Sequence, residues 1–120
     1  MERKAVTKDN QKLNSNFLIG QLSVQQLIDL SIDSINDNYI ENETRKELIN
    51  RGKDNIQARI IIKKICRNAI TGLESLLQKI ATENNNKEII KSFKNKFLNA
   101  VSMLDRLELE WQKHDLGIKT

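Results

Sequence analysis

Few side chains in this sequence have the types and spacing that catalysis or metal binding requires. His114 is the only histidine and Cys66 the only cysteine. Cys66 falls on an apolar helix face, where a small buried thiol is the usual interpretation. A catalytic nucleophile needs a base held beside it, and a zinc site needs four ligands, of which these two residues supply at most two. We therefore expect no enzyme activity, no metal and no cofactor.

The strongest candidate for a functional surface is a set of basic residues. Between positions 51 and 67, six basic side chains stand against one acidic side chain. Arg59, Lys63 and Arg67 recur every four residues, so on a helix they share one face, away from the apolar stripe. A second group of lysines follows Asn86, at the opposite end of the preceding helix. The candidate basic face comprises Arg51, Lys53, Arg59, Lys63, Lys64, Arg67, Lys87, Lys91 and Lys94.

Two smaller groups are also candidates for docking surfaces. Asp29, Asp33 and Asp37 recur every four residues and predict an acidic face on the first helix. Ile56 and Ile60 point away from the apolar stripe and predict an apolar partner surface, unless a short helix over residues 44–51 covers them.

The elements that would position these groups are long helices. Apolar residues recur at spacings of four and three from Ile62 to Ile80 and again from Phe93 to Trp111, the pattern of a helix that packs along one seam. Asparagines at positions 84–86 predict a turn. We therefore expect helices over 55–83 and 87–115 to form an antiparallel hairpin. The phenylalanines and Trp111 should supply most of its buried area.

Shorter helices should precede this hairpin. Ser23 with Gln26 forms a capping-box pattern that predicts a first helix over 23–39, lying across the hairpin groove. Thr44 with Glu47 forms a second capping box and predicts a short helix over 44–51, ended by Gly52. One continuous helix from 44 onward is the alternative. Gly117 suits the left-handed residue after the last helix.

Length and composition limit the fold to one domain. The chain has 120 residues, no proline and 38% apolar residues, which suits a thin helical core. Residues 1–16 are polar and predict a flexible N-terminal arm before a single domain over 17–120. No apolar run has the length of a membrane span, and the N-terminus lacks a secretory pattern. We expect a cytoplasmic protein that does not enter a membrane.

The predicted fold class is all-α: a bundle of three main helices and one short helix, dominated by a long antiparallel hairpin. Because the core of one chain is thin for such long helices, we expect a homodimer. The leading functional hypothesis is a non-enzymatic protein-interaction module, that is, an adaptor, regulator or inhibitor that presents charged helix faces to a partner protein. The alternative is a nucleic-acid-binding accessory protein that uses the basic face on helix 55–83 to neutralise phosphates.

Overall fold

The computed structural model describes residues 19–34, 37–83 and 86–118. Within these ranges the chain forms four α-helices and no strand: α2 (Val24–Asp33), α3 (Asn38–Lys53), α4 (Ile56–Glu83) and α5 (Lys87–Asp115). The predicted all-α fold with a dominant helical hairpin is confirmed. The predicted arm over residues 1–16 lies outside the described residues. None of the described helices is long and apolar enough to cross a membrane.

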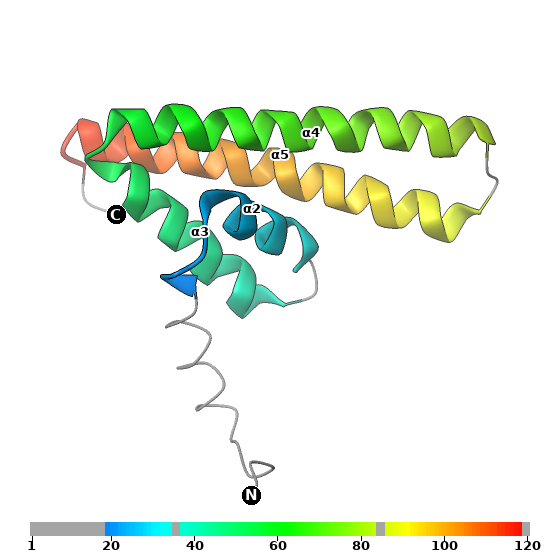
Figure 1. Ribbon diagram of the computed structural model, residues 1–120, viewed down its shortest axis with the longest axis horizontal. Helices are drawn as coiled ribbons and strands as arrows, with labels where there is room; N and C mark the ends of the chain where they lie inside the picture. The colour runs from blue at the N-terminus through cyan, green and yellow to red at the C-terminus, as the bar shows by residue number, and fades with distance from the viewer. Residues whose placement is uncertain (1–18, 35–36, 84–85, 119–120) are drawn as a thin grey trace, which may run out of the picture.

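The four helices have a stepped arrangement. Helices α4 and α5 run side by side and antiparallel, and α2 and α3 pack together across one half of this hairpin (Figure 1). That half contains the first turns of α4 and the last turns of α5. The other half projects beyond α2 and α3 with no described element against it (Figure 1). The described chain therefore has a broad base and a narrow two-helix tip.

The start of α2 and both ends of α5 lie where the sequence predicted them. The Ser23 hydroxyl accepts from the Gln26 amide and the Gln26 side chain accepts from the Ser23 amide, as the capping box predicts. Asn86 caps α5 by accepting from the amides of Glu88 and Ile89. Gly117 adopts the predicted left-handed conformation, with φ at 75°. The capping box therefore predicts the start of α2, and the asparagine turn and Gly117 predict the two ends of α5.

The boundary between α2 and α3 differs from the prediction. Helix α2 ends at Asp33 rather than at residue 39, and α3 begins at Asn38 rather than at Thr44. The N-cap of α3 is Asp37, whose carboxylate accepts from the Ile40 amide at 3.1 Å. The Thr44 hydroxyl instead donates to the carbonyls of Ile40 and Glu41, as a threonine inside a helix does. The predicted short helix is therefore a 16-residue helix.

Helix α3 runs through Gly52 to Lys53, and an indole ring occupies the space beside this glycine. A Cβ at position 52 would lie 2.5 Å from the ring of Trp111. The indole nitrogen of Trp111 also donates to the carbonyl of Ile49 at 2.9 Å. Asp54 and Asn55 interrupt the helical structure between α3 and α4. The Asn55 side chain accepts from the Ala58 amide in the first turn of α4. The alternative of one continuous helix from residue 44 is therefore wrong.

The hydrophobic core lies entirely within the broad base. Leu27 and Ile28 of α2, Leu48 of α3, and Ile62 of α4 are fully buried there. Cys66 is the last buried residue of α4, and burial raises the pKa of its thiol to about 12. The remaining buried core side chains are Ile19, Ile32, Ala100, Met103, Leu104, Leu107 and Trp111.

The apolar seam continues past this core, where the described helices bury it only in part. No residue of 67–83 or 86–99 is buried. Phe93 and Phe97 are only partly buried, so Trp111, which is 3% exposed, is the only one of the three aromatic side chains in the buried core of the described residues. The physical reason is that α2 and α3 are too short and too close to the base to cover Phe93 and Phe97.

A polar contact marks the border between the two halves. The Asn99 side-chain amide donates to the carbonyls of Ser31 and Ile32 at 3.0 and 3.2 Å, near the end of α2. Its carbonyl oxygen accepts from Arg45 of α3 at 2.6 Å. One side chain of α5 therefore fixes both covering helices at the point where the core ends.

The contact between Trp111 and Gly52 leads to a stability prediction. We expect Gly52→Ala to lower the free energy of unfolding by about 1–3 kcal/mol, because the added methyl overlaps the indole ring. Gly72→Ala is the matched control: nothing lies within 4 Å of a Cβ there, and alanine should stabilise the helix interior by about 1 kcal/mol. Urea unfolding followed by circular dichroism measures both. Equal effects of the two substitutions would contradict this account of the junction.

Candidate interaction surfaces

The predicted basic face is divided by the fold, and its central residue is structural. Arg59 donates to the carbonyls of Gly52 and Lys53 at the end of α3. Both of its terminal nitrogens donate to the carboxylate of Asp115 at 2.7 Å. Its guanidinium also lies over the ring of Trp111, 5.5 Å from the ring centroid. Because its side chain is only 12% exposed, Arg59 joins three helices and leaves little surface for a partner.

The pKa shifts of this ion pair follow from the same geometry. The hydrogen bond to Asp115 raises the pKa of Arg59, and the same bond lowers the pKa of Asp115. Both groups are therefore charged over the whole physiological range. The bidentate geometry is the strong form of an arginine–carboxylate contact.

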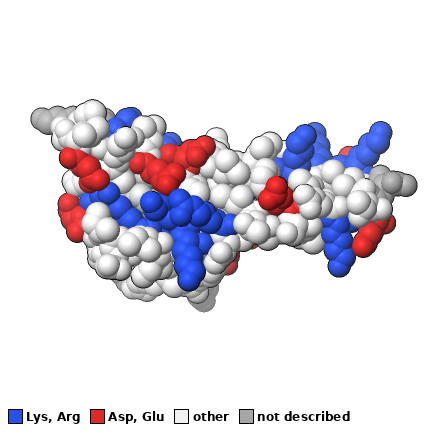
Figure 2. Space-filling view, turned by 90° about the horizontal axis from the view of Figure 1, so that it is seen from above, with Lys and Arg blue, Asp and Glu red and all other residues white. Residues whose placement is uncertain are grey.

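Other members of the basic face have acidic partners in the described chain. Lys63 and Arg67 lie 3.8 and 3.6 Å from the carboxylate of Glu108 on α5. Arg51 pairs with Glu47 at 2.8 Å and donates to the carbonyl of Gly20. Arg59, Lys63 and Arg67 do share one face, which lies beside acidic residues of α5. Arg67 keeps 59% of its side chain exposed there. Figure 2 shows the result, with red carboxylates beside the blue cluster over the broad end.

The remaining predicted cations lie apart from this cluster. Lys64 is exposed on α4, and Lys53 lines a pocket between α3 and α5. Lys87, Lys91 and Lys94 are exposed on the first turns of α5, at the narrow tip. Figure 2 shows this second group of charges separated from the first by a mostly uncharged stretch. The structure therefore does not bring the nine residues together.

The predicted acidic face is also divided. Asp29 and Asp33 lie on α2, where Asp29 accepts from Gln25 and Asp33 lies 3.5 Å from Lys96. Asp37 belongs to the next helix as its N-cap. The fixed spacing of four residues predicts one face only if the helix continues, and α2 ends at Asp33.

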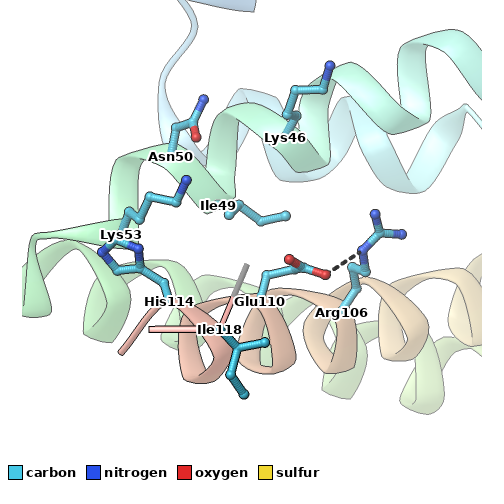
Figure 3. A pocket seen from close by; sticks show the side chains of 8 residues that line it. All are labelled: Lys46, Ile49, Asn50, Lys53, Arg106, Glu110, His114 and Ile118. Atoms are coloured by element: carbon cyan, nitrogen blue, oxygen red, sulfur yellow. Dashed lines mark ion pairs between the residues drawn. The ribbon is translucent and has the colours of Figure 1, made fainter. Parts of the chain in front are cut away.

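A polar pocket of about 540 Å³ lies between α3 and α5. Figure 3 shows Lys46, Asn50 and Lys53 on its α3 wall and Arg106, Glu110 and His114 on its α5 wall, with the side chains of Ile49 and Ile118 also lining it.

The charges of this pocket are largely compensated. Glu110 lies 3.6 Å from Arg106 and 3.8 Å from Lys113, and Lys46 lies 3.3 Å from Glu43. The His114 ring nitrogen is 2.8 Å from the carboxylate of Asp54. No serine or cysteine lines the pocket. The described residues also contain no cluster of three metal-ligating side chains. The arrangement therefore offers charged and polar contacts and no serine or cysteine nucleophile.

An apolar groove of about 380 Å³ lies where the uncovered seam meets the end of α2. Leu73 and Leu76 of α4 line it together with Phe93 of α5. Ile32 and the two aspartates of α2 close its inner end, and Lys96 lies beside them. Leu76 is 40% exposed. Partly exposed residues of an apolar seam normally pack against another element, so this groove is a candidate docking surface.

The predicted apolar pair on α4 is exposed. Ile56 and Ile60 are 60% and 52% exposed, so α3 does not cover them. They lie about 120° around α4 from the buried residues Ile62 and Cys66, at 100° per residue. They form a second apolar surface on the described chain.

Comparisons with known proteins add no function. Neither protein-family models nor curated proteins match the sequence, and no solved structure matches the fold. A function for this chain therefore has to be inferred from its own geometry.

Two features of these surfaces were not found from the sequence. The spacing of Arg59 from Asp115 carries no signal, since 56 residues separate them and only the hairpin brings them together. The groove could have been found by comparing helix lengths, because a 28-residue helix and a 29-residue helix form a seam longer than the two shorter helices cover.

The structural role of Arg59 leads to a second prediction. We expect Arg59→Met to lower the free energy of unfolding by at least about 1.5 kcal/mol, because it removes charge-assisted hydrogen bonds to Asp115 and to two helix-end carbonyls. Lys64→Met removes the same charge from an exposed site and should stay within about 0.5 kcal/mol. Chemical unfolding of both variants measures the difference. An Arg59→Met variant with an unchanged free energy of unfolding would show that the contacts of Arg59 do not stabilise the fold.

Proposed function

We propose that this chain is a non-enzymatic protein-interaction module whose docking surface is the open half of the hairpin. The open half is defined here as residues 72–83 of α4 and 87–98 of α5. The observation that supports the proposal is an apolar seam without a buried residue, in a chain whose buried core lies in the other half.

The energetics of the seam favour a partner. Each square ångström of apolar surface removed from water contributes about 25 cal/mol, and Leu73, Leu76 and Phe93 all retain surface that a partner helix would bury. Two antiparallel helices present a groove that accepts the ridge of further helices, as in a four-helix bundle. A helical partner would therefore bury the apolar seam of the open half in the way that α2 and α3 bury the seam of the base.

The charged faces support the proposal less than the seam does. Arg59, Lys63 and Arg67 already have carboxylate partners, and a ligand that used them would have to displace Glu108 or Asp115. The same pairing weighs against the alternative of phosphate binding by the basic face. Salt-dependent binding of a labelled DNA duplex by the wild-type chain would favour that alternative.

The proposal also includes two more specific expectations from the sequence. It includes a homodimer, because a second copy supplies the helices that the seam lacks. It also includes a cytoplasmic location, with which a single buried thiol at Cys66 is compatible.

Site-specific crosslinking tests the docking surface whatever the identity of the partner. A photoreactive phenylalanine analogue replaces Leu76 in the groove, or Leu109, which is 47% exposed and absent from the groove. We expect protein adducts after irradiation in the native host from position 76 and not from position 109. A third variant at Ile60 tests the second apolar surface.

The three positions separate the outcomes. Adducts confined to position 60 would move the docking surface to the Ile56–Ile60 patch and contradict the proposal. An absence of adducts from all three would contradict an interaction module. Circular dichroism of each variant checks that the helices are retained, as the exposure of all three side chains leads us to expect.

A further inference from the structure

We infer that the occupant of the open half is the open half of a second copy, docked antiparallel about a two-fold axis. This inference rests on the proposed function and names the partner of the same surface. It is carried by the stepped shape of the chain and by the distribution of charge between α2 and the hairpin tip.

The stepped shape of the described chain allows two copies to fit against each other. The open half projects past the end of α2, so that a step separates the two (Figure 1). Twelve residues of α4 form its length, which is about 18 Å at 1.5 Å per residue. If two copies meet groove to groove and antiparallel, the tip of each reaches the step of the other. A two-fold arrangement then covers both open halves over their full length and leaves no unpaired end.

The charges of the two ends are opposite. Helix α2 contains two aspartates, and its last turn has no basic residue of its own. Asp33 lies 3.5 Å from Lys96 of α5 but keeps 63% of its side chain exposed, so its carboxylate can also face a second copy. Residues 79–94 at the tip contain four lysines and two glutamates in the described chain: Lys79, Lys87, Lys91, Lys94, Glu83 and Glu88. Antiparallel docking therefore brings a positive tip against a negative α2, and the symmetry makes this contact twice. Parallel docking would instead place tip against tip.

The size of the contact also favours a second copy over a lone helix. Two helices each about 10 Å wide and about 18 Å long present a flat footprint of roughly 350 Å². A stable interface buries roughly 800 Å² of accessible surface on each partner. A lone helix fills only the groove, whereas a second copy also brings its tip onto α2. The additional contact at both ends brings the interface closer to the usual size.

Leu76 and Phe93 would lie at the centre of this interface. Both line the groove, and the two-fold axis brings each of them near its own copy on the other chain. The contacts that remove the largest apolar area from water would then be central, with charged contacts at the rim, as in well-packed interfaces.

A charge exchange tests the inference. One variant carries Asp29→Lys and Asp33→Lys, and the other carries Lys79→Glu and Lys87→Glu. In each variant alone, the antiparallel dimer brings like charges together at both ends, and we expect the dissociation constant from sedimentation velocity to rise at least tenfold above that of the wild type. In an equimolar mixture, each positive end meets a negative one, and heterodimers should form with close to wild-type affinity.

Two controls separate geometry from net charge and from internal contacts. The double variant Lys46→Glu and Lys64→Glu changes the net charge as much as the tip variant does, at exposed positions outside the open half, and should dimerise like the wild type. Asp29→Lys alone preserves the contact between Asp33 and Lys96 and should still weaken the dimer.

Each remaining outcome decides between the two proposals. A wild-type chain that stays monomeric at the highest concentration measured, while position 76 crosslinks another protein, would overturn self-association and retain the interaction module. A monomer without adducts would overturn both. A dimer that neither double variant weakens, or that mixing does not restore, would overturn the antiparallel arrangement.

Discussion

The contact between the indole of Trp111 and the backbone of Gly52 is the one on which the arrangement of the four helices depends. It lets α3 approach the end of α5 so closely that a methyl group would not fit. The guanidinium of Arg59 lies over the same ring and ties the ends of α3 and α5 to the start of α4. Three helix ends therefore meet at the base of the hairpin. Because α3 is fixed there, its 16 residues and the 10 of α2 can cover only the nearby half of the seam.

The uncovered half is a consequence of this anchoring rather than of a weak sequence pattern. The seam residues of the open half have the same spacing as those of the core, and nothing in their types separates Leu73 from Ile62. Their difference in burial comes from the length of the covering helices and from Asn99, which binds the end of α2 to α5 and ends the core there. A second copy would extend the four-helix arrangement of the base over the tip, with the same kind of apolar packing and with no new type of contact.

The sequence predicted those parts of the fold that local interactions determine. The capping box at Ser23, the start of α5 after the asparagines and the seams of α4 and α5 depend on residues close to one another in the chain. The start of α3 was missed because Asp37 and Thr44 both have cap chemistry, and only the fold decides which one is used. The surface predictions were weaker for a related reason. Spacing places Arg59, Lys63 and Arg67 on one face, but it does not show that Glu108 and Asp115 of another helix lie beside them. The groove exists because no described helix covers one side of the seam beyond α2. The local pattern of apolar residues in the seam does not show this.

Hydrogen exchange measured over a series of protein concentrations tests the central claim most directly. The amides of α4 near Cys66 and of α5 near Leu107 belong to the packed base and should exchange slowly at every concentration. If the open half is a docking surface for a second copy, the amides of residues 72–83 and 87–98 should exchange quickly in dilute solution and become protected as the concentration rises. Exchange in these two segments that is independent of concentration, in the absence of any other protein, would contradict self-association through the open half.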